Sequence, residues 1–106
     1  MTRTVYLNGE YFSENEAKIS IFDRGFLMAD AVYEVTSVLD GKLIDFKGHA
    51  DRLNRSLDEL DIKNPLSYEE LLEVHRELVR LNNIDEGLVY IQTVSYTHLT
   101  LPTTTI

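Results

Sequence analysis

An Asp-Gly pair at residues 40–41 constrains the fold of this chain more than any other local feature. Such a pair favours a tight two-residue turn, because both residues tolerate positive φ. The preceding residues, 32–39, are largely β-branched or aromatic, and residues 42–44 return after the pair. The sequence therefore predicts a β-hairpin in the first half of the chain.

A second pair of this kind, Asn-Gly at residues 8–9, separates two short β-prone runs at 4–7 and 10–12. This spacing predicts another hairpin at the N-terminus. Residues 23–31 mix glycine, aspartate and apolar side chains, and they predict a loop or a single helical turn.

Two segments show the apolar spacing of amphipathic helices. The first is expected at residues 47–60, with Asp45 as its cap. Its apolar positions recur at intervals of three and four, at Ala50, Leu53, Leu57 and Leu60. A second helix is expected at residues 68–81, because Ser67 and Glu70 have the spacing of a capping box.

After Gly87, the largely apolar run at 88–94 predicts a buried strand. The predicted order is then hairpin, hairpin, helix, helix and strand. That order indicates the α+β class, with an antiparallel sheet of hairpins and two helices. A chain of 106 residues is long enough for one hydrophobic core.

Charge and composition exclude several classes of function. The formal net charge is −8 and the basic residues form no cluster, so we expect no binding to nucleic acids or anionic membranes. There is no cysteine, and the three histidines are not spaced as metal ligands, so no metal site is expected. No apolar run approaches the ~20 residues of a membrane span, and no signal peptide opens the chain. We expect a cytoplasmic protein.

The last residues differ from the rest in composition. Residues 95–106 contain five threonines and no charged side chain. A natural disordered end is one interpretation. Our hypothesis is that this tail is non-native read-through, such as an adapter sequence, because it begins abruptly after a strand. We therefore divide the chain into a domain at 1–94 and an anomalous tail at 95–106.

An ordered set of short motifs runs from about residue 4 to residue 94. The motifs are Asn8-Gly9, Asp23-Arg24-Gly25, Asp30, Val32-Tyr33-Glu34-Val35, Asp40-Gly41, His49, Asp51-Arg52-Leu53, Ser56-Leu57 and Gly87-Leu88-Val89-Tyr90-Ile91-Gln92. Together they resemble the class IV (fold type IV) pyridoxal-phosphate aminotransferases, and within that family most closely the D-amino-acid branch.

The resemblance implies the N-terminal small domain of a two-domain, homodimeric enzyme, with pyridoxal 5'-phosphate at the interface with a larger domain. The implied reaction transfers an amino group between D-amino acids and 2-oxo acids. Branched-chain aminotransferase and aminodeoxychorismate lyase share the scaffold and are alternatives. A further alternative, from a different class, is a small α+β interaction domain without catalysis.

By position, Arg52 matches the arginine that holds the cofactor phosphate, a task that suits a forked guanidinium. The alternative is a surface charge paired with Glu34 or Glu59. His49, three residues before Arg52 on the same helix face, would support its orientation. A histidine that faces solvent is an equal alternative.

Tyr33 matches a tyrosine whose hydroxyl lies near the substrate carboxylate, although a half-buried strand aromatic would have the same pattern. Val35, on the same face of the strand, would limit the side-chain pocket, with core packing as the alternative. Asp23 and Arg24 form a turn-stabilising pair in our interpretation, and Asp30 a cap.

The family's Schiff-base lysine is not matched in this chain. Its lysines are Lys18, Lys42, Lys47 and Lys63, and none stands at the corresponding position. We therefore assign no catalytic residue and expect the chain alone to be inactive. The Arg-x-His carboxylate clamp of D-amino-acid enzymes would fall on Thr100 and Pro102, inside the anomalous tail.

Overall fold

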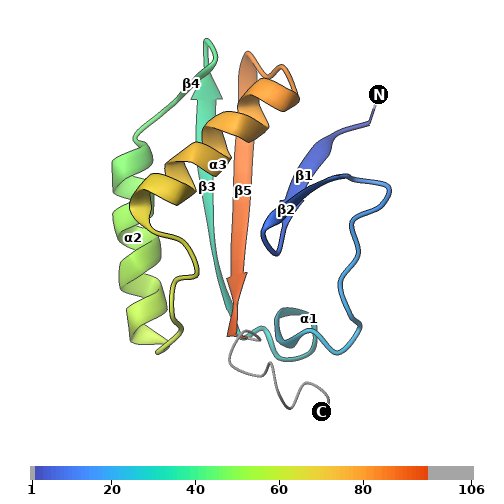
Figure 1. Cartoon of the computed structure of the whole chain (residues 1–106). Helices are drawn as coiled ribbons and strands as arrows, with labels where there is room; N and C mark the ends of the chain where they lie inside the picture. Colours follow the sequence, from blue (N-terminus) through green and yellow to red (C-terminus); the bar gives the residue numbers. More distant parts are fainter. Residues whose placement is uncertain (1, 96–106) are drawn as a thin grey trace.

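The structure is a computed structural model that describes residues 2–95 (Figure 1). Its elements, in chain order, are β1 Thr4–Leu7, β2 Glu10–Ser13, α1 Arg24–Met28, β3 Ala31–Leu39, β4 Lys42–Leu43, α2 Phe46–Glu59, α3 Tyr68–Leu81 and β5 Glu86–Val94. A three-stranded sheet has the order β4-β3-β5, and β1 and β2 form a separate two-stranded sheet. All pairings are antiparallel, so the predicted α+β class is confirmed.

The two predicted hairpins form at their predicted turns. Asn8 and Gly9 both have positive φ, as do Asp40 and Gly41, which is the backbone that a tight hairpin turn requires. The N-terminal hairpin is attached to α3 by the side chain of Asn82. The Thr4 N–H donates to Asn82 Oδ1 at 2.7 Å, and Asn82 Nδ2 donates to the Thr4 carbonyl at 2.9 Å.

The centre of the larger sheet is a ladder in which β3 pairs with β5 over nine residues, from Ala31 opposite Val94 to Leu39 opposite Glu86. Burial alternates along both strands. The prediction of a buried final strand is therefore wrong for one face, because Leu88 and Tyr90 are 62% and 58% exposed. Helices cover only the opposite face, so period-two alternation decides which side chains are buried.

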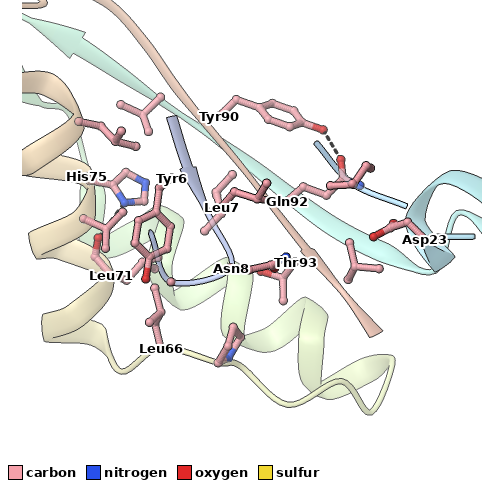
Figure 2. A pocket seen from close by; sticks show the side chains of 18 residues that line it. Tyr6, Leu7, Asn8, Asp23, Leu66, Leu71, His75, Tyr90, Gln92 and Thr93 are labelled. Atoms are coloured by element: carbon pink, nitrogen blue, oxygen red, sulfur yellow. Dashed lines mark hydrogen bonds between the residues drawn. The ribbon is translucent and has the colours of Figure 1, made fainter. Parts of the chain in front are cut away.

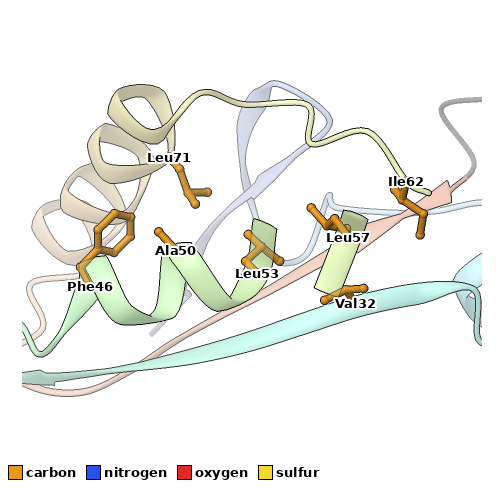
Figure 3. Packing of buried hydrophobic residues seen from close by; sticks show 7 residues of the cluster. All are labelled: Val32, Phe46, Ala50, Leu53, Leu57, Ile62 and Leu71. Carbon is orange, nitrogen blue, oxygen red and sulfur yellow. The ribbon is translucent and has the colours of Figure 1, made fainter. Parts of the chain in front are cut away.

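Helix α2 begins after Asp45, whose carboxylate accepts from the Gly48 N–H at 3.3 Å. Its inner face joins the core cluster of Val32, Phe46, Ala50, Leu53, Leu57, Ile62 and Leu71 (Figure 3). The expected inward position of Leu60 is wrong, since that side chain is 51% exposed. The helix ends at Glu59 and the chain turns through Asp61, which has positive φ, so Ile62 enters the core instead.

Helix α3 has the predicted bounds and the predicted capping box. The Glu70 N–H donates to Ser67 Oγ at 3.2 Å, and the Ser67 N–H donates to Glu70 Oε1 at 2.9 Å. His75 is buried at 3% exposure, with its ring 4.8 Å from that of Phe46. Helix α3 thus ties the core under the sheet to the N-terminal hairpin.

Helix α1 is the single helical turn that the sequence predicted, and it lies at the end of the sheet where β5 ends (Figure 1). Asp23 caps it by accepting from the Gly25 N–H at 2.8 Å. Within residues 2–95, no helix has the length and apolar character needed to cross a membrane. Most of the anomalous tail, residues 96–106, lies outside the described residues.

Candidate functional site

A buried carboxylate is the centre of the candidate site. Glu34 lies in β3 at an inward position and is only 7% exposed. Arg52, on α2, grips it with a forked pair of hydrogen bonds. Arg52 Nε donates to Oε2 at 2.8 Å, and Nη2 donates to Oε1 at 2.9 Å. The sequence identified Glu34 only as a partner for a surface charge.

The sequence contains a pattern from which the buried position of Glu34 could have been predicted. An ionisable residue stands in the inward series of a strand whose other inward members are Val32, Thr36 and Val38. A carboxylate in such a series must find charged or hydrogen-bonding partners, because unpaired buried charge is very costly.

His49 contacts the same carboxylate. Its Nδ1 lies 2.8 Å from Glu34 Oε1. An ionised carboxylate only accepts hydrogen bonds, so Nδ1 must carry the proton, which fixes the ring tautomer when His49 is neutral. Arg52 Nη2 lies 3.4 Å from this nitrogen. Both nitrogens are then donors, and both donate to Glu34 Oε1. His49 thus steadies Arg52 through Glu34 rather than by a direct bond.

The electrostatics of the three residues agree with this geometry. The hydrogen bond from Arg52 holds the pKa of Glu34 below its usual range, with a smaller contribution from His49, and these outweigh the opposing effect of burial. The same hydrogen bond raises the pKa of Arg52. Glu34 and Arg52 are both ionised at neutral pH.

Arg52 keeps one edge of its guanidinium available for an anion. The side chain is 55% exposed, and its Nη1 makes no hydrogen bond to any of residues 2–95. Since Nε and Nη2 are held by Glu34, the outer edge is the part that can face a ligand. Exposed, oriented N–H donors are the chemistry that a phosphate group requires, so this residue fits a phosphate-bearing cofactor.

Tyr33 and Val35 lie on the opposite face of β3 from Glu34. Tyr33 is 63% exposed, and its ring stacks on that of Tyr90, with the centroids 5.7 Å apart and an interplanar angle of 16°. Val35 faces Tyr90 across the ladder. The structure therefore brings Arg52 together with Glu34 and His49, and it places Tyr33 and Val35 on the outer face.

One edge of β3 is open near Tyr33. Strand β4 pairs only with Val38 and Leu39, so the part of β3 around Tyr33 has no neighbouring strand on that side within the described residues. Arg52 reaches β3 from the inner face through Glu34, and Tyr33 lies on the outer face of the same strand.

A cavity of about 690 Å³ lies away from this edge, between β1, α3 and the far side of β5 (Figure 2). Its walls are mainly apolar, with Leu66, Leu71 and the buried His75 on one side. Tyr90 donates to Gln92 Oε1 at 3.0 Å on the strand that lines the other side (Figure 2). None of the predicted site residues lines it.

The motif residues near α1 have structural contacts. Arg24 Nη2 pairs with Asp30 Oδ2 at 2.9 Å, and Ser95 Oγ donates to the same carboxylate oxygen. Asp23 stabilises this turn by capping α1, while Arg24 does so through Asp30. Through Asp30, these hydrogen bonds connect the turn before β3 to the residue that follows β5. Thr100 and Pro102, where the sequence placed a clamp, lie outside the described residues.

The chain matches a known family in sequence. Residues 31–98 match the model of the family described as amino-transferase class IV. The chain is 43% identical over 88 residues to D-alanine aminotransferase of Staphylococcus haemolyticus, a match covering 83% of this chain and 31% of that enzyme. The corresponding enzyme of Staphylococcus aureus (strain N315) gives the same identity and coverage. The chain thus spans about a third of the length of the curated relatives it matches.

Solved structures give the same architecture. A branched-chain aminotransferase of the archaeon Thermoproteus uzoniensis, determined with norvaline, superposes with a TM-score of 0.73 at 26% identity, over 87% of this chain and 32% of that one. A second branched-chain amino acid aminotransferase, determined with pyridoxamine 5'-phosphate, has a TM-score of 0.80 at 23% identity over the same shares, which supports the fold. The predicted resemblance is confirmed. The chain belongs to the class IV aminotransferases.

Proposed function

We propose that this chain is the N-terminal part of a pyridoxal 5'-phosphate-dependent enzyme that transfers an amino group between D-amino acids and 2-oxo acids. The observation that carries the proposal is the Arg52 guanidinium, held by Glu34 on one edge and exposed on the other. The similarity to enzymes named D-alanine aminotransferase supports the D-amino-acid substrate class.

In this proposal Arg52 holds the cofactor phosphate through its outer edge. A guanidinium suits the task because it stays charged at any physiological pH and offers two parallel N–H donors. His49 supports Arg52 by holding the shared carboxylate in place. When bound, the cofactor supplies the electron sink that amino-group transfer needs.

Tyr33 and Val35 form the substrate side of the proposed site. The Tyr33 phenol donates a hydrogen bond to the substrate carboxylate, and the stacked Tyr90 ring restricts the directions in which it can point. Val35, on the same face, limits the room for the substrate side chain. The two proposed contacts approach one ligand from either side of the β3 edge.

The remaining parts of the proposal concern polypeptide outside this chain. The lysine that bonds to the cofactor is supplied elsewhere, so the 106-residue chain alone is inactive. The active form is a cytoplasmic homodimer, and its partners are small amino and 2-oxo acids rather than nucleic acids, membranes or metals.

Branched-chain aminotransferase activity is the second candidate, because the solved structures with the same fold carry that name. An aminodeoxychorismate lyase or a non-catalytic interaction domain is also compatible with this fold, since a shared scaffold does not fix the reaction.

The test uses the product of the gene's full open reading frame. We expect a near-visible imine band with pyridoxal phosphate, which the 106-residue chain alone should not give. We also expect faster turnover of D-alanine than of L-leucine with 2-oxoglutarate. Faster turnover of L-leucine would select the branched-chain activity. The absence of both activities would overturn the proposal.

Arg52→Ala tests the phosphate assignment, with Arg55→Ala as the matched control. Arg55 is an exposed arginine three residues further along α2. We expect the cofactor dissociation constant to rise at least tenfold in the first variant and to stay unchanged in the second. An equal effect of the two substitutions would contradict a specific role for Arg52.

A further inference from the structure

We infer that Glu34 is a positioning residue, which holds the Arg52 guanidinium in the one orientation that presents its outer edge to a phosphate group. The inference rests on the phosphate role proposed for Arg52. It adds a buried residue to a site whose other members are exposed or half-buried.

A carboxylate at the position of Glu34 is costly for folding, because this position faces the core. Glu34 is 7% exposed and belongs to the inward series of β3. An apolar side chain of similar volume at such a position often gives equal or greater stability than a buried ion pair. The carboxylate is instead satisfied by three donor contacts, two from Arg52 and one from His49. Stability alone does not account for this arrangement.

The geometry of the contacts also supports a positioning role. Glu34 engages Nε and Nη2 of Arg52 side-on, so the plane and direction of the guanidinium are both determined. His49 holds Oε1 from a third direction and restricts rotation of the carboxylate. An arginine oriented before the ligand arrives loses less conformational freedom on binding, which improves affinity.

Another pair in the chain, on α3, has the same forked geometry but different surroundings. Glu77 and Arg80 are also joined by two hydrogen bonds, but they are three residues apart on α3, and the Arg80 side chain is 68% exposed. Within residues 2–95, no third side chain donates a hydrogen bond to Glu77 as His49 does to Glu34. The Glu34 and Arg52 pair instead joins a strand to a helix across the core face.

A positioning role and simple charge balance predict opposite changes in phosphate affinity when the charge of Glu34 is removed. Glu34 neutralises part of the positive field of Arg52, so removal of its charge would tighten phosphate binding if electrostatics alone mattered. If positioning dominates, removal weakens binding because the guanidinium becomes mobile. The two explanations therefore give opposite shifts in the dissociation constant.

The experiment measures the dissociation constant of pyridoxal phosphate by fluorescence titration, using the product of the full open reading frame. Glu34→Gln is compared with wild type and with Glu77→Gln, the matched control from the exposed forked pair. We expect the constant to rise roughly tenfold in Glu34→Gln, the size typical of lost supporting contacts behind a ligand-binding group. Glu77→Gln should leave it unchanged.

A second readout reports on Arg52 without any ligand. In 15N–1H spectra, the Arg52 Nε–Hε signal should be distinct in wild type and should shift and broaden in Glu34→Gln. The corresponding change in Glu77→Gln should be confined to Arg80. Glu34→Leu guards against misfolding, since an apolar side chain at this inward position should preserve the fold while removing the grip on Arg52.

The outcomes separate this inference from the proposed function. A folded Glu34→Gln or Glu34→Leu variant whose dissociation constant is unchanged or lowered overturns the positioning role. If Arg52→Ala still weakens binding in that case, the phosphate role of Arg52 stands alone. If Arg52→Ala has no effect either, both proposals fall.

Discussion

The two faces of the β3–β5 ladder share one backbone and have opposite surroundings. The inner face carries the buried side chains of Val32, Val38 and Val89, and α2 and α3 lie over this face (Figure 1). The outer face carries Tyr33 and Tyr90, which stack on each other and stay more than half exposed. A single strand therefore supplies both the core and an uncovered aromatic surface. Glu34 and Tyr33, adjacent in sequence, belong to different environments for this reason.

The largest expected effect comes from the core beneath the inner face. Leu53→Ala removes a side chain that is 1% exposed, and it should lower the free energy of unfolding by about 2–5 kcal/mol. The outer-face control, Leu88→Ala, should change it by no more than about 0.5 kcal/mol. Urea denaturation measures both. Equal losses would show that the outer face is also part of the folded core.

Glu34 gives the next largest effect, together with a pH signature. Its pKa is lowered in the folded state, chiefly by the hydrogen bond from Arg52, so it stabilises the fold above its unfolded pKa of about 4.3. Near neutral pH, Glu34→Gln should cost about 1.5–3 kcal/mol, the range for hydrogen bonds to charged groups. The difference from wild type should shrink as the pH falls below about 4.3. A difference that stays constant from acidic to neutral pH would contradict the ion pair.

Enlarged side chains sharpen the contrast between the faces. Val38→Phe should cost about 1–3 kcal/mol, because Val38 is 2% exposed in a packed core. Val35→Phe, on the outer face of the same strand, should cost less than half as much. Thermal melts of the two variants decide the point, and a reversed order would mean that the faces are assigned incorrectly.

The smallest expected effect is the loss of the aromatic stack. Tyr90→Ala should cost about 0.5–1.5 kcal/mol beyond its lost surface burial. A double-mutant cycle with Tyr33→Ala isolates the coupling between the rings, which are 5.7 Å apart. A coupling energy near zero would show that the stack does not restrain Tyr33.

The sequence predicts the local features of this fold well. The Asn8-Gly9 and Asp40-Gly41 turns and the Ser67 capping box depend on side chains and backbone within a few residues, and all three are confirmed. The errors concern Leu60 and the outer side of β5. Both are questions of burial, which depends on what covers a surface rather than on the segment itself.

The candidate site shows the same division. The neighbourhood of His49 and Arg52 follows from helical spacing, and the structure places them 3.4 Å apart at their nearest nitrogens. That both converge on Glu34 could not be deduced from spacing, because it depends on how α2 packs across β3. The roles proposed for Tyr33 and Val35 stay predictions.

The pairing of β3 with β5 also has a consequence for protein synthesis. The partners of residues 31–39 are residues 86–94, with two helices between them. A nascent chain emerges from the ribosome at about 5–20 residues per second, so β3 waits for several seconds before its main partner is made. During that interval its hydrogen-bonding edge is open to other chains, and chaperone capture is expected to matter most in this window.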